Sequence, residues 1–197
     1  VALAKREGFR SRAAFKIQEI NEKFGIFKPG GRVVDLGAAP GGWSQIASRA
    51  VGSDHGKGCV VAIDLLPIDP ISGVEFAIVD FLDPEAPDLV KKMLGGGADV
   101  VLSDMAANAT GHKKTDHLKI MGIAELAAEF SLDVLDKGGS FVAKVLQGGT
   151  EGTLLADLKM SFSSVKHFKP KASRADSAEL YVVATGFRGK VREGDDS

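Results

Sequence analysis

One lysine interrupts a run of residues that otherwise predicts a buried strand. Lys144 stands in the stretch GGSFVAKVLQGG, with apolar residues at 141–143 and 145–146. A charged amine inside an apolar strand costs free energy unless another group balances it or the protein uses it. One interpretation is a side chain that extends from the end of the strand to the surface. The other is an amine that takes part in chemistry.

Three aspartates at the ends of predicted strands supply the opposite charge. Asp64 ends CVVAID, Asp80 ends the apolar part of VEFAIVD, and Asp104 ends DVVLSD. Taken singly, each is as easily a helix cap or a loop residue. An acid in the position of Asp64 can accept hydrogen bonds from ribose hydroxyls, and Asp80 could meet an adenine amino group. Together they indicate a binding pocket.

A glycine-rich loop, DLGAAPGGWSQ, follows the first predicted strand. Glycines let a ligand approach the backbone closely. The spacing G-x-G-x-x-G, which accommodates a dinucleotide pyrophosphate, is absent from this loop. The loop and the three aspartates therefore favour a nucleoside without phosphates.

Strand and helix patterns alternate along most of the chain. This alternation predicts a mostly parallel α/β sheet with helices on both faces and ligands at the carboxyl ends of its strands. The last two predicted strands have no helix between them, so we expect them to pair antiparallel at one edge. The predicted strands are 32–37, 59–64, 74–80, 99–104, 139–146, 163–169 and 178–187, and the predicted helices are 11–25, 42–51, 84–94, 116–135 and 150–162.

The length of 197 residues fits one domain with a full core. We expect a single domain over 1–190, with a leading basic segment and helix at about 5–25, and a frayed tail over 191–197. The single cysteine, Cys59, excludes an intrachain disulfide. No apolar run is long enough to span a bilayer and no secretory signal is visible, so we expect a cytoplasmic protein.

Basic residues gather in two stretches although the formal net charge is only −1. Such clusters can bind phosphates, or they can be ordinary solvated surface. The candidate RNA-binding residues are Arg10 and Arg12 in the first stretch, and Lys169, Lys171 and Arg174 in the second. His112 and His117 could suggest a metal, but no cysteine partner supports one, and we predict no metal site.

Six stretches resemble the FtsJ/RrmJ (RlmE) family of ribosomal RNA 2′-O-methyltransferases. They are GFRSRAAFKIQEI, VVDLGAAPGGWSQ, AIDLLPIDPI, VLSDMAANATG, GGSFVAKVLQG and SRADSAELYVVATGF. They follow the family order and cover nearly the whole chain. The resemblance implies a Rossmann-like S-adenosylmethionine-dependent methyltransferase fold, with seven strands of which the last is antiparallel. One departure is Ala107, where the family pattern leads us to expect a proline.

The resemblance also implies the site residues. S-adenosylmethionine, which leaves as S-adenosylhomocysteine, would be held by Gly41, Trp43, Asp64, Asp80 and Asp104. Trp43 could instead be plain core packing. A catalytic tetrad would consist of Lys16, Asp104, Lys144 and Glu179.

Methylation of a ribose 2′-hydroxyl requires alignment of the reactants and a base. Alignment can contribute roughly 7–11 kcal/mol in favourable models, and a base must remove the hydroxyl proton. Lysine is normally protonated near neutral pH; burial and a neighbouring cation such as Lys16 favour a neutral amine, whereas Asp104 opposes it. We predict that Lys144 is the proton acceptor, oriented by Asp104, while Lys16 and Glu179 place the ribose. Alternatively, Lys144 stays charged and stabilises an oxyanion.

These features predict a monomeric enzyme that methylates a uridine ribose in large-subunit (23S-type) ribosomal RNA, naked or within the subunit. The alternatives are a methyltransferase for transfer RNA or mRNA caps, a nucleotide-dependent oxidoreductase, and a non-catalytic RNA-binding ribosome-assembly factor. The absent G-x-G-x-x-G disfavours the oxidoreductase, and the complete tetrad disfavours the non-catalytic module.

Overall fold

A computed structural model of the chain describes residues 2–106, 111–148 and 152–190. The tail predicted over 191–197 and the departure at Ala107 lie outside the described residues. The strands are β1 (Arg32–Leu36), β2 (Cys59–Asp64), β3 (Val74–Ile78), β4 (Ala98–Ser103), β5 (Leu135–Leu146), β6 (Phe162–Phe168) and β7 (Glu179–Phe187). The helices are α1 (Ala2–Arg6), α2 (Ala13–Phe24), α3 (Gly42–Val51), α4 (Ala86–Leu94), α5 (Lys113–Val134) and α6 (Thr153–Ser161), with a 3-10 turn η1 (Ser53–His55).

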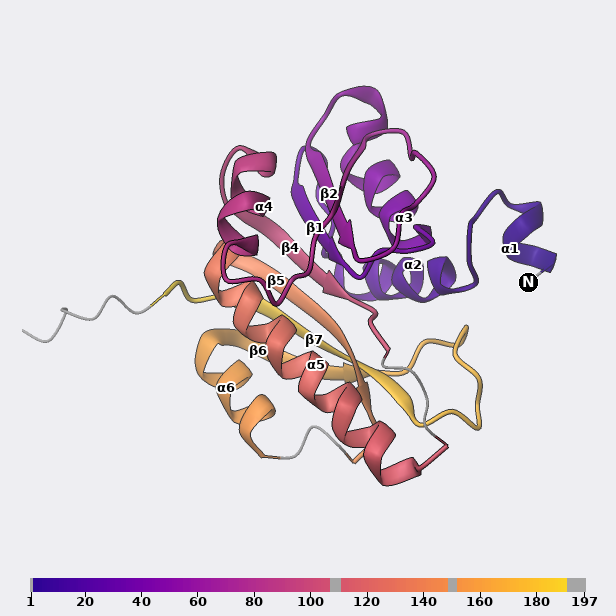
Figure 1. Cartoon of the computed structure of the whole chain (residues 1–197), viewed down its shortest axis with the longest axis vertical. Coiled ribbons are helices and arrows are strands. Elements are labelled where there is room, and N and C mark those ends of the chain that lie inside the picture. The colour runs from indigo at the N-terminus through magenta and orange to yellow at the C-terminus, as the bar shows by residue number, and fades with distance from the viewer. Residues whose placement is uncertain (1, 107–110, 149–151, 191–197) are drawn as a thin grey trace, which may run out of the picture.

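The strands form one seven-stranded sheet in the order β3-β2-β1-β4-β5-β7-β6 (Figure 1). The pairs β1–β2, β1–β4, β2–β3 and β4–β5 are parallel. Strand β7 pairs antiparallel with both of its neighbours, β5 and β6. The predicted mostly parallel sheet with an antiparallel last strand is confirmed. The strand order reverses between β1 and β4, which is where open α/β sheets bind their ligands.

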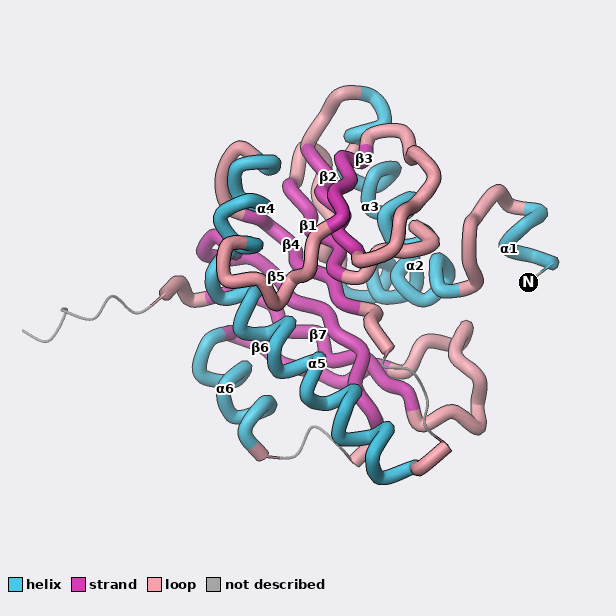
Figure 2. Tube along the Cα trace, viewed as in Figure 1, coloured by secondary structure: helices cyan, strands magenta, loops and turns pink. Residues whose placement is uncertain are grey.

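Helices cover both faces of the sheet (Figure 2). Neighbouring residues of one strand point to opposite faces. Val33 therefore belongs to the apolar layer under α2 and α3, and Val34 belongs to the layer under α4, α5 and α6. The same division holds for Val60 and Val61 on β2. Each face thus has its own apolar layer, and the sheet itself is buried between them. Among the described residues, no helix combines the length and the apolarity needed to cross a membrane.

Helix α2 packs through a stripe of apolar residues at helical spacing, formed by Ala14, Ile17 and Ile20. It ends at Gly25, whose φ of 60° suits glycine, and whose N–H bonds to the carbonyl of Asn21. The stripe leaves Glu19 on a flank, where its two oxygens accept the backbone N–H groups of Lys171 and Ala172, each at 2.9 Å. Helix α2 therefore anchors the segment that precedes β7.

Most element boundaries differ from the sequence prediction by a few residues, α1 is a separate short helix, and two of the differences have a clear physical reason. Strand β5 starts at Leu135, directly after α5, because the chain turns extended there with φ −70° and ψ 138°. Strand β6 starts at Phe162, which the sequence pattern predicts in the preceding helix. Phe162 is buried in the core, where it contacts Phe187 on β7. Burial of this ring therefore ends the helix one residue early.

A buried carboxyl joins β1 to α3 and so holds the glycine-rich loop between them. Asp35 is 1% exposed and accepts a hydrogen bond from the Ser44 hydroxyl at 2.6 Å. Burial raises the pKa of Asp35 from 3.8 to about 7; the Ser44 bond lowers it, and the charges of Asp104 and Asp64 raise it further. The protonated form is therefore favoured in the folded state.

This shift predicts how stability depends on pH. A raised carboxyl pKa stabilises the fold most below the unfolded pKa, and the contribution is lost as pH rises through about 7. Between about pH 5 and about pH 8, Asp35 should lower the unfolding free energy by roughly 2–3 kcal/mol. Asp35→Asn should remove this decline, since the amide does not titrate and can still accept the Ser44 bond. Urea unfolding at the two pH values measures the difference.

Asp99→Asn is the matched control. Asp99 is an exposed carboxylate that accepts the backbone N–H of Arg32 at 2.8 Å, so its replacement should leave the decline in place. If the unfolding free energy of Asp35→Asn falls with pH as much as that of wild type, Asp35 titrates in the ordinary range of a carboxyl group.

Candidate active site

The predicted site residues meet at the carboxyl edge of the sheet. Asp64 ends β2 and Asp104 directly follows β4. Because β7 runs antiparallel, its first residue, Glu179, lies at the same edge, opposite Leu146 at the end of β5. The same register places Tyr181 opposite Lys144. Residues far apart in the chain are thus brought together by strand direction alone.

Lys144 is held between two carboxylates. Its Nζ lies 3.2 Å from Asp104 Oδ1 and 3.5 Å from Glu179 Oε1. Lys144 follows the buried Val142 by two residues, so both side chains share the face covered by α2. Only 9% of the Lys144 side chain is exposed, so the amine does not extend into solvent from the strand end.

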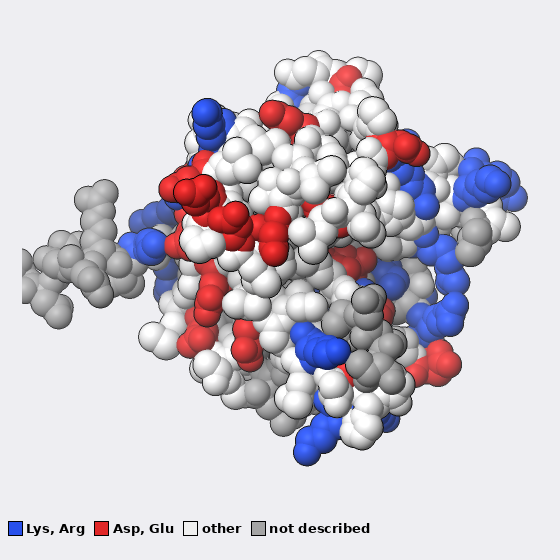
Figure 3. Space-filling view, viewed as in Figure 1, with Lys and Arg blue, Asp and Glu red and all other residues white. Residues whose placement is uncertain are grey.

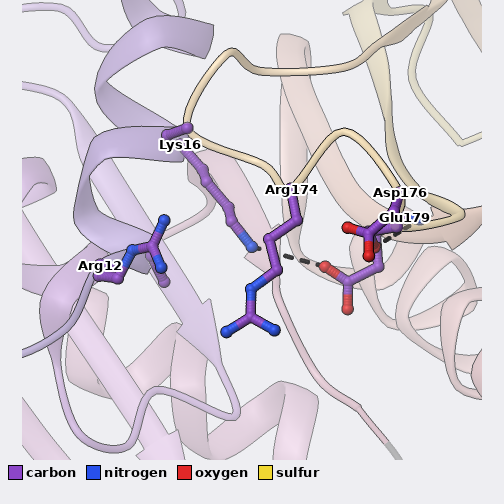
Figure 4. A pocket seen from close by; sticks show the side chains of 8 residues that line it. Arg12, Lys16, Arg174, Asp176 and Glu179 are labelled. Carbon is purple, nitrogen blue, oxygen red and sulfur yellow. Dashed lines mark hydrogen bonds and ion pairs between the residues drawn. The ribbon is translucent and has the colours of Figure 1, made fainter. Parts of the chain in front are cut away.

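Lys16 completes the predicted tetrad from the other side. Its Nζ lies 3.5 Å from Glu179 Oε2 (Figure 4). The Glu179 carboxylate therefore bridges two lysines, one through each oxygen. Lysines and carboxylates alternate in one network of ion pairs, from Lys16 through Glu179 and Lys144 to Asp104. All four residues of the predicted tetrad lie together.

Tyr181 is a fifth residue of this network, and the sequence interpretation missed it. Its hydroxyl donates to Asp104 Oδ1 at 2.7 Å, the same oxygen that faces Lys144. Burial and then the charge of Asp104 raise the pKa of Tyr181 well above its usual range. The hydroxyl is therefore a fixed donor. The available signal was its position two residues after Glu179, because alternate residues of a strand share a face.

Trp43 supports the site from the core. Its side chain is buried, its indole N–H donates to the Ala13 carbonyl at 2.8 Å, and its ring lies 5.5 Å from that of Tyr181. The indole therefore packs α3 against α2 and β7. The contact of Trp43 with the cofactor stays a prediction. Because the indole is used in packing, the backbone of Trp43 is the part that would make this contact.

The glycine-rich loop is tied to the end of β2. Asp64 accepts the backbone N–H of Ala39 at 2.8 Å and that of Leu66 at 2.9 Å. Gly37 has a φ of 68°, and a Cβ there would meet the Met105 side chain at 2.2 Å. Glycine at this position thus allows the end of β1 to lie against the residue that follows Asp104.

Asp80 lies further along the same edge. It accepts the backbone N–H of Leu82 at 2.9 Å, which fixes the turn after β3. It lines a cavity of about 550 Å³ together with Ile78 and Leu89. Asp80 is separate from the tetrad contacts, and its contact with the cofactor stays a prediction.

A second cavity, of about 450 Å³, opens beside Lys16 and Glu179. Arg12 contributes from the start of α2, and Arg174 and Asp176 contribute from the segment before β7 (Figure 4). Both guanidinium groups extend into this space next to the Lys16 amine. The cavity thus joins a basic surface to the tetrad. Within the described residues, no three His, Cys, Asp or Glu side chains are placed so that they could hold a metal ion together.

The predicted RNA-binding residues fall into two groups. Arg12 and Arg174 line the cavity, and Lys171 is exposed. Arg10 instead donates to three backbone carbonyls, of Pro40, Asp69 and Pro70. Lys169 likewise donates to the carbonyls of Ser177 and Glu179. Sequence alone does not separate the two groups, because the partners are backbone atoms of distant segments.

Comparisons with known proteins agree with this architecture. A family model described as FtsJ-like methyltransferase matches residues 9–187. A protein of Azorhizobium caulinodans named ribosomal RNA large subunit methyltransferase E is 64% identical, over 100% of this chain and 82% of that protein. One of the same name from Xanthobacter autotrophicus is 66% identical, over 97% and 75%. A crystal structure from Plasmodium falciparum, assigned as a ribosomal RNA methyltransferase, superposes with a TM-score of 0.81 at 28% identity, covering 92% of this chain and 100% of that one.

Proposed function

The chain belongs to the FtsJ-like methyltransferase family, and on that premise we propose that it transfers a methyl group from S-adenosylmethionine to a ribose 2′-hydroxyl of large-subunit ribosomal RNA. The names of the two bacterial relatives support large-subunit ribosomal RNA as the substrate. The observation that carries the chemistry is the Lys144 amine, held between Asp104 and Glu179 next to a basic cavity.

The residues at the carboxyl edge fit this cofactor. S-adenosylmethionine supplies an activated methyl group on a cationic sulfonium. Asp64, Asp80 and Asp104 would offer carboxylates to its ribose, its adenine amino group and its positive charge. Three carboxylates would repel a pyrophosphate, so these three aspartates do not suit a dinucleotide cofactor. This disfavours the oxidoreductase alternative.

Lys144 would accept the proton of the 2′-hydroxyl at Nζ. Asp104 and Glu179 are already in contact with this atom, so the ammonium that results is stabilised where it forms. Tyr181 contacts Asp104, and Lys16 contacts Glu179. Each carboxylate is therefore shared between Lys144 and a second partner, which fixes its position beside the amine.

The charge distribution favours one direction of approach for RNA. Acidic side chains gather around α4, and basic side chains gather toward α1 and α2 (Figure 3). Four of these acids, Asp80, Asp83, Glu85 and Asp88, line the cavity next to β3. A polyanion is attracted to the basic side and repelled from the acidic one. Arg12 and Arg174 would bind phosphates beside the ribose that Lys16 and Glu179 place.

Replacement of Lys144 tests its role as proton acceptor. Lys144→Ala should lower the methyl-transfer rate by roughly 10²–10⁴-fold, while S-adenosylmethionine binding stays near wild type in calorimetry. Lys144→Arg keeps a cation that does not lose its proton and should be nearly as slow. Normal turnover in Lys144→Arg would instead support the alternative, in which a charged Lys144 stabilises an oxyanion.

Tyr181→Phe removes only the hydroxyl on Asp104. Asp104 then loses the hydrogen bond that helps to fix it beside Lys144, so the methyl-transfer rate should fall roughly 3–10-fold. Ser131→Ala is the control, because Ser131 is another buried hydroxyl, bonded at 2.7 Å to the carbonyl of Ala128 on α5. A Tyr181→Phe rate equal to that of wild type would exclude the role of Tyr181.

The substrate is tested by mapping 2′-O-methylation in cellular RNA with and without the protein. We expect one uridine of large-subunit ribosomal RNA to lose its methyl group, and purified protein to restore it on undermethylated large subunits or their naked RNA. Loss in transfer RNA or at mRNA caps would support those alternatives. Binding to subunits without any transfer of labelled methyl groups would support the non-catalytic assembly factor.

A further inference from the structure

Arg10 and Arg12 stand two residues apart in one basic segment, yet their surroundings differ. Arg12 is exposed and lines the cavity beside Lys16. Arg10 is half-buried, and its guanidinium faces backbone carbonyls. Two arginines that look equivalent in the sequence are therefore placed for different tasks.

The Arg10 guanidinium joins two loops that flank the predicted cofactor pocket. Nη1 donates to the Pro40 carbonyl at 3.4 Å and to the Asp69 carbonyl at 2.5 Å, and Nη2 donates to the Pro70 carbonyl at 2.6 Å. Pro40 belongs to the glycine-rich loop between β1 and α3, whereas Asp69 and Pro70 belong to the connection between β2 and β3. A planar, forked cation can bind carbonyls on both loops at once.

The two loops touch at the point that Arg10 spans. A Cβ on Gly41, whose φ is 117°, would lie 2.5 Å from Ile71 Cδ1 and 3.3 Å from Arg10 Cδ. Closer to the sheet, Asp64 ties the same two loops together through the N–H groups of Ala39 and Leu66. The pair of loops is thus fixed at its base by Asp64 and at its outer end by Arg10.

The position of Arg10 is itself fixed by α3. Its backbone N–H donates to Gln45 Oε1 at 2.9 Å, and Gln45 Nε2 donates to the Gly8 carbonyl at 3.2 Å. One amide side chain therefore holds the segment of residues 8–10 at two points. A phosphate that bound Arg10 would have to compete with all three of its carbonyl partners.

We propose that Arg10 is a positioning residue for the cofactor, which clamps the 38–41 and 65–71 loops together, and that it is not a phosphate anchor for RNA. The inference rests on the proposed function, since that function places S-adenosylmethionine at the carboxyl edge of the sheet, which these loops flank. Arg12 carries the RNA contact of this segment. Binding of each ligand thus depends on a different arginine.

Paired substitutions separate the two roles. Arg10→Ala should raise the dissociation constant for S-adenosylmethionine by roughly tenfold in calorimetry, because the loops lose their preorganised spacing. Its affinity for a fluorescein-labelled RNA hairpin, measured by anisotropy, should stay within about twofold of wild type, with an unchanged salt dependence. Arg12→Ala should do the reverse, with weaker RNA binding, a salt slope smaller by about 1, and unchanged cofactor binding.

Two further measurements keep the outcomes distinct. Thermal unfolding, followed by circular dichroism, checks that each variant is folded at the binding temperature. Arg10→Lys keeps the positive charge but lacks the forked guanidinium, so it should bind the cofactor more weakly than wild type. If wild type does not bind S-adenosylmethionine, the proposed function fails. If wild type binds it, and folded Arg10→Ala binds it equally well or loses RNA affinity as Arg12→Ala does, the clamp is excluded.

Discussion

The buried amine of Lys144 is the constraint on which the rest of the site depends. A cation in an apolar strand requires carboxylates within contact distance, and none of its neighbours along β5 supplies one. Asp104 comes from the end of β4, and Glu179 comes from the start of β7. A residue at the start of a strand reaches this edge only if that strand is antiparallel. The reversed direction of β7 thus balances the charge of Lys144.

The same charges link the substrate side of the molecule to its core. Glu179 connects Lys144 to Lys16 on α2, and Glu19 on the same helix holds the backbone of residues 171–172. Helix α2 therefore positions both a tetrad lysine and the segment that carries Arg174. Its own placement depends on the apolar stripe that packs on the sheet and on the Trp43 hydrogen bond. Packing of one helix thereby sets the geometry of the cavity.

Much of this could be predicted because the signals are local. Apolar alternation marked the strands, the aspartates followed them, and Lys144 stood out against its neighbours. The rest depends on contacts between distant segments. The sequence interpretation does not single out Tyr181; the strand register places its hydroxyl on Asp104. Arg10 cannot be told from the other basic residues by sequence, and only the structure shows that backbone carbonyls of two loops accept its hydrogen bonds. No spacing within the sequence encodes either partner.

The ion pair between Lys16 and Glu179 joins residues that lie 163 positions apart. During synthesis, α2 leaves the ribosome long before β7 does. Before β7 pairs with β5, Lys144 lacks Glu179 and Asp104 lacks Tyr181. A chain that ends before residue 179 therefore cannot form the tetrad. The site is complete only when the final strand has entered the sheet.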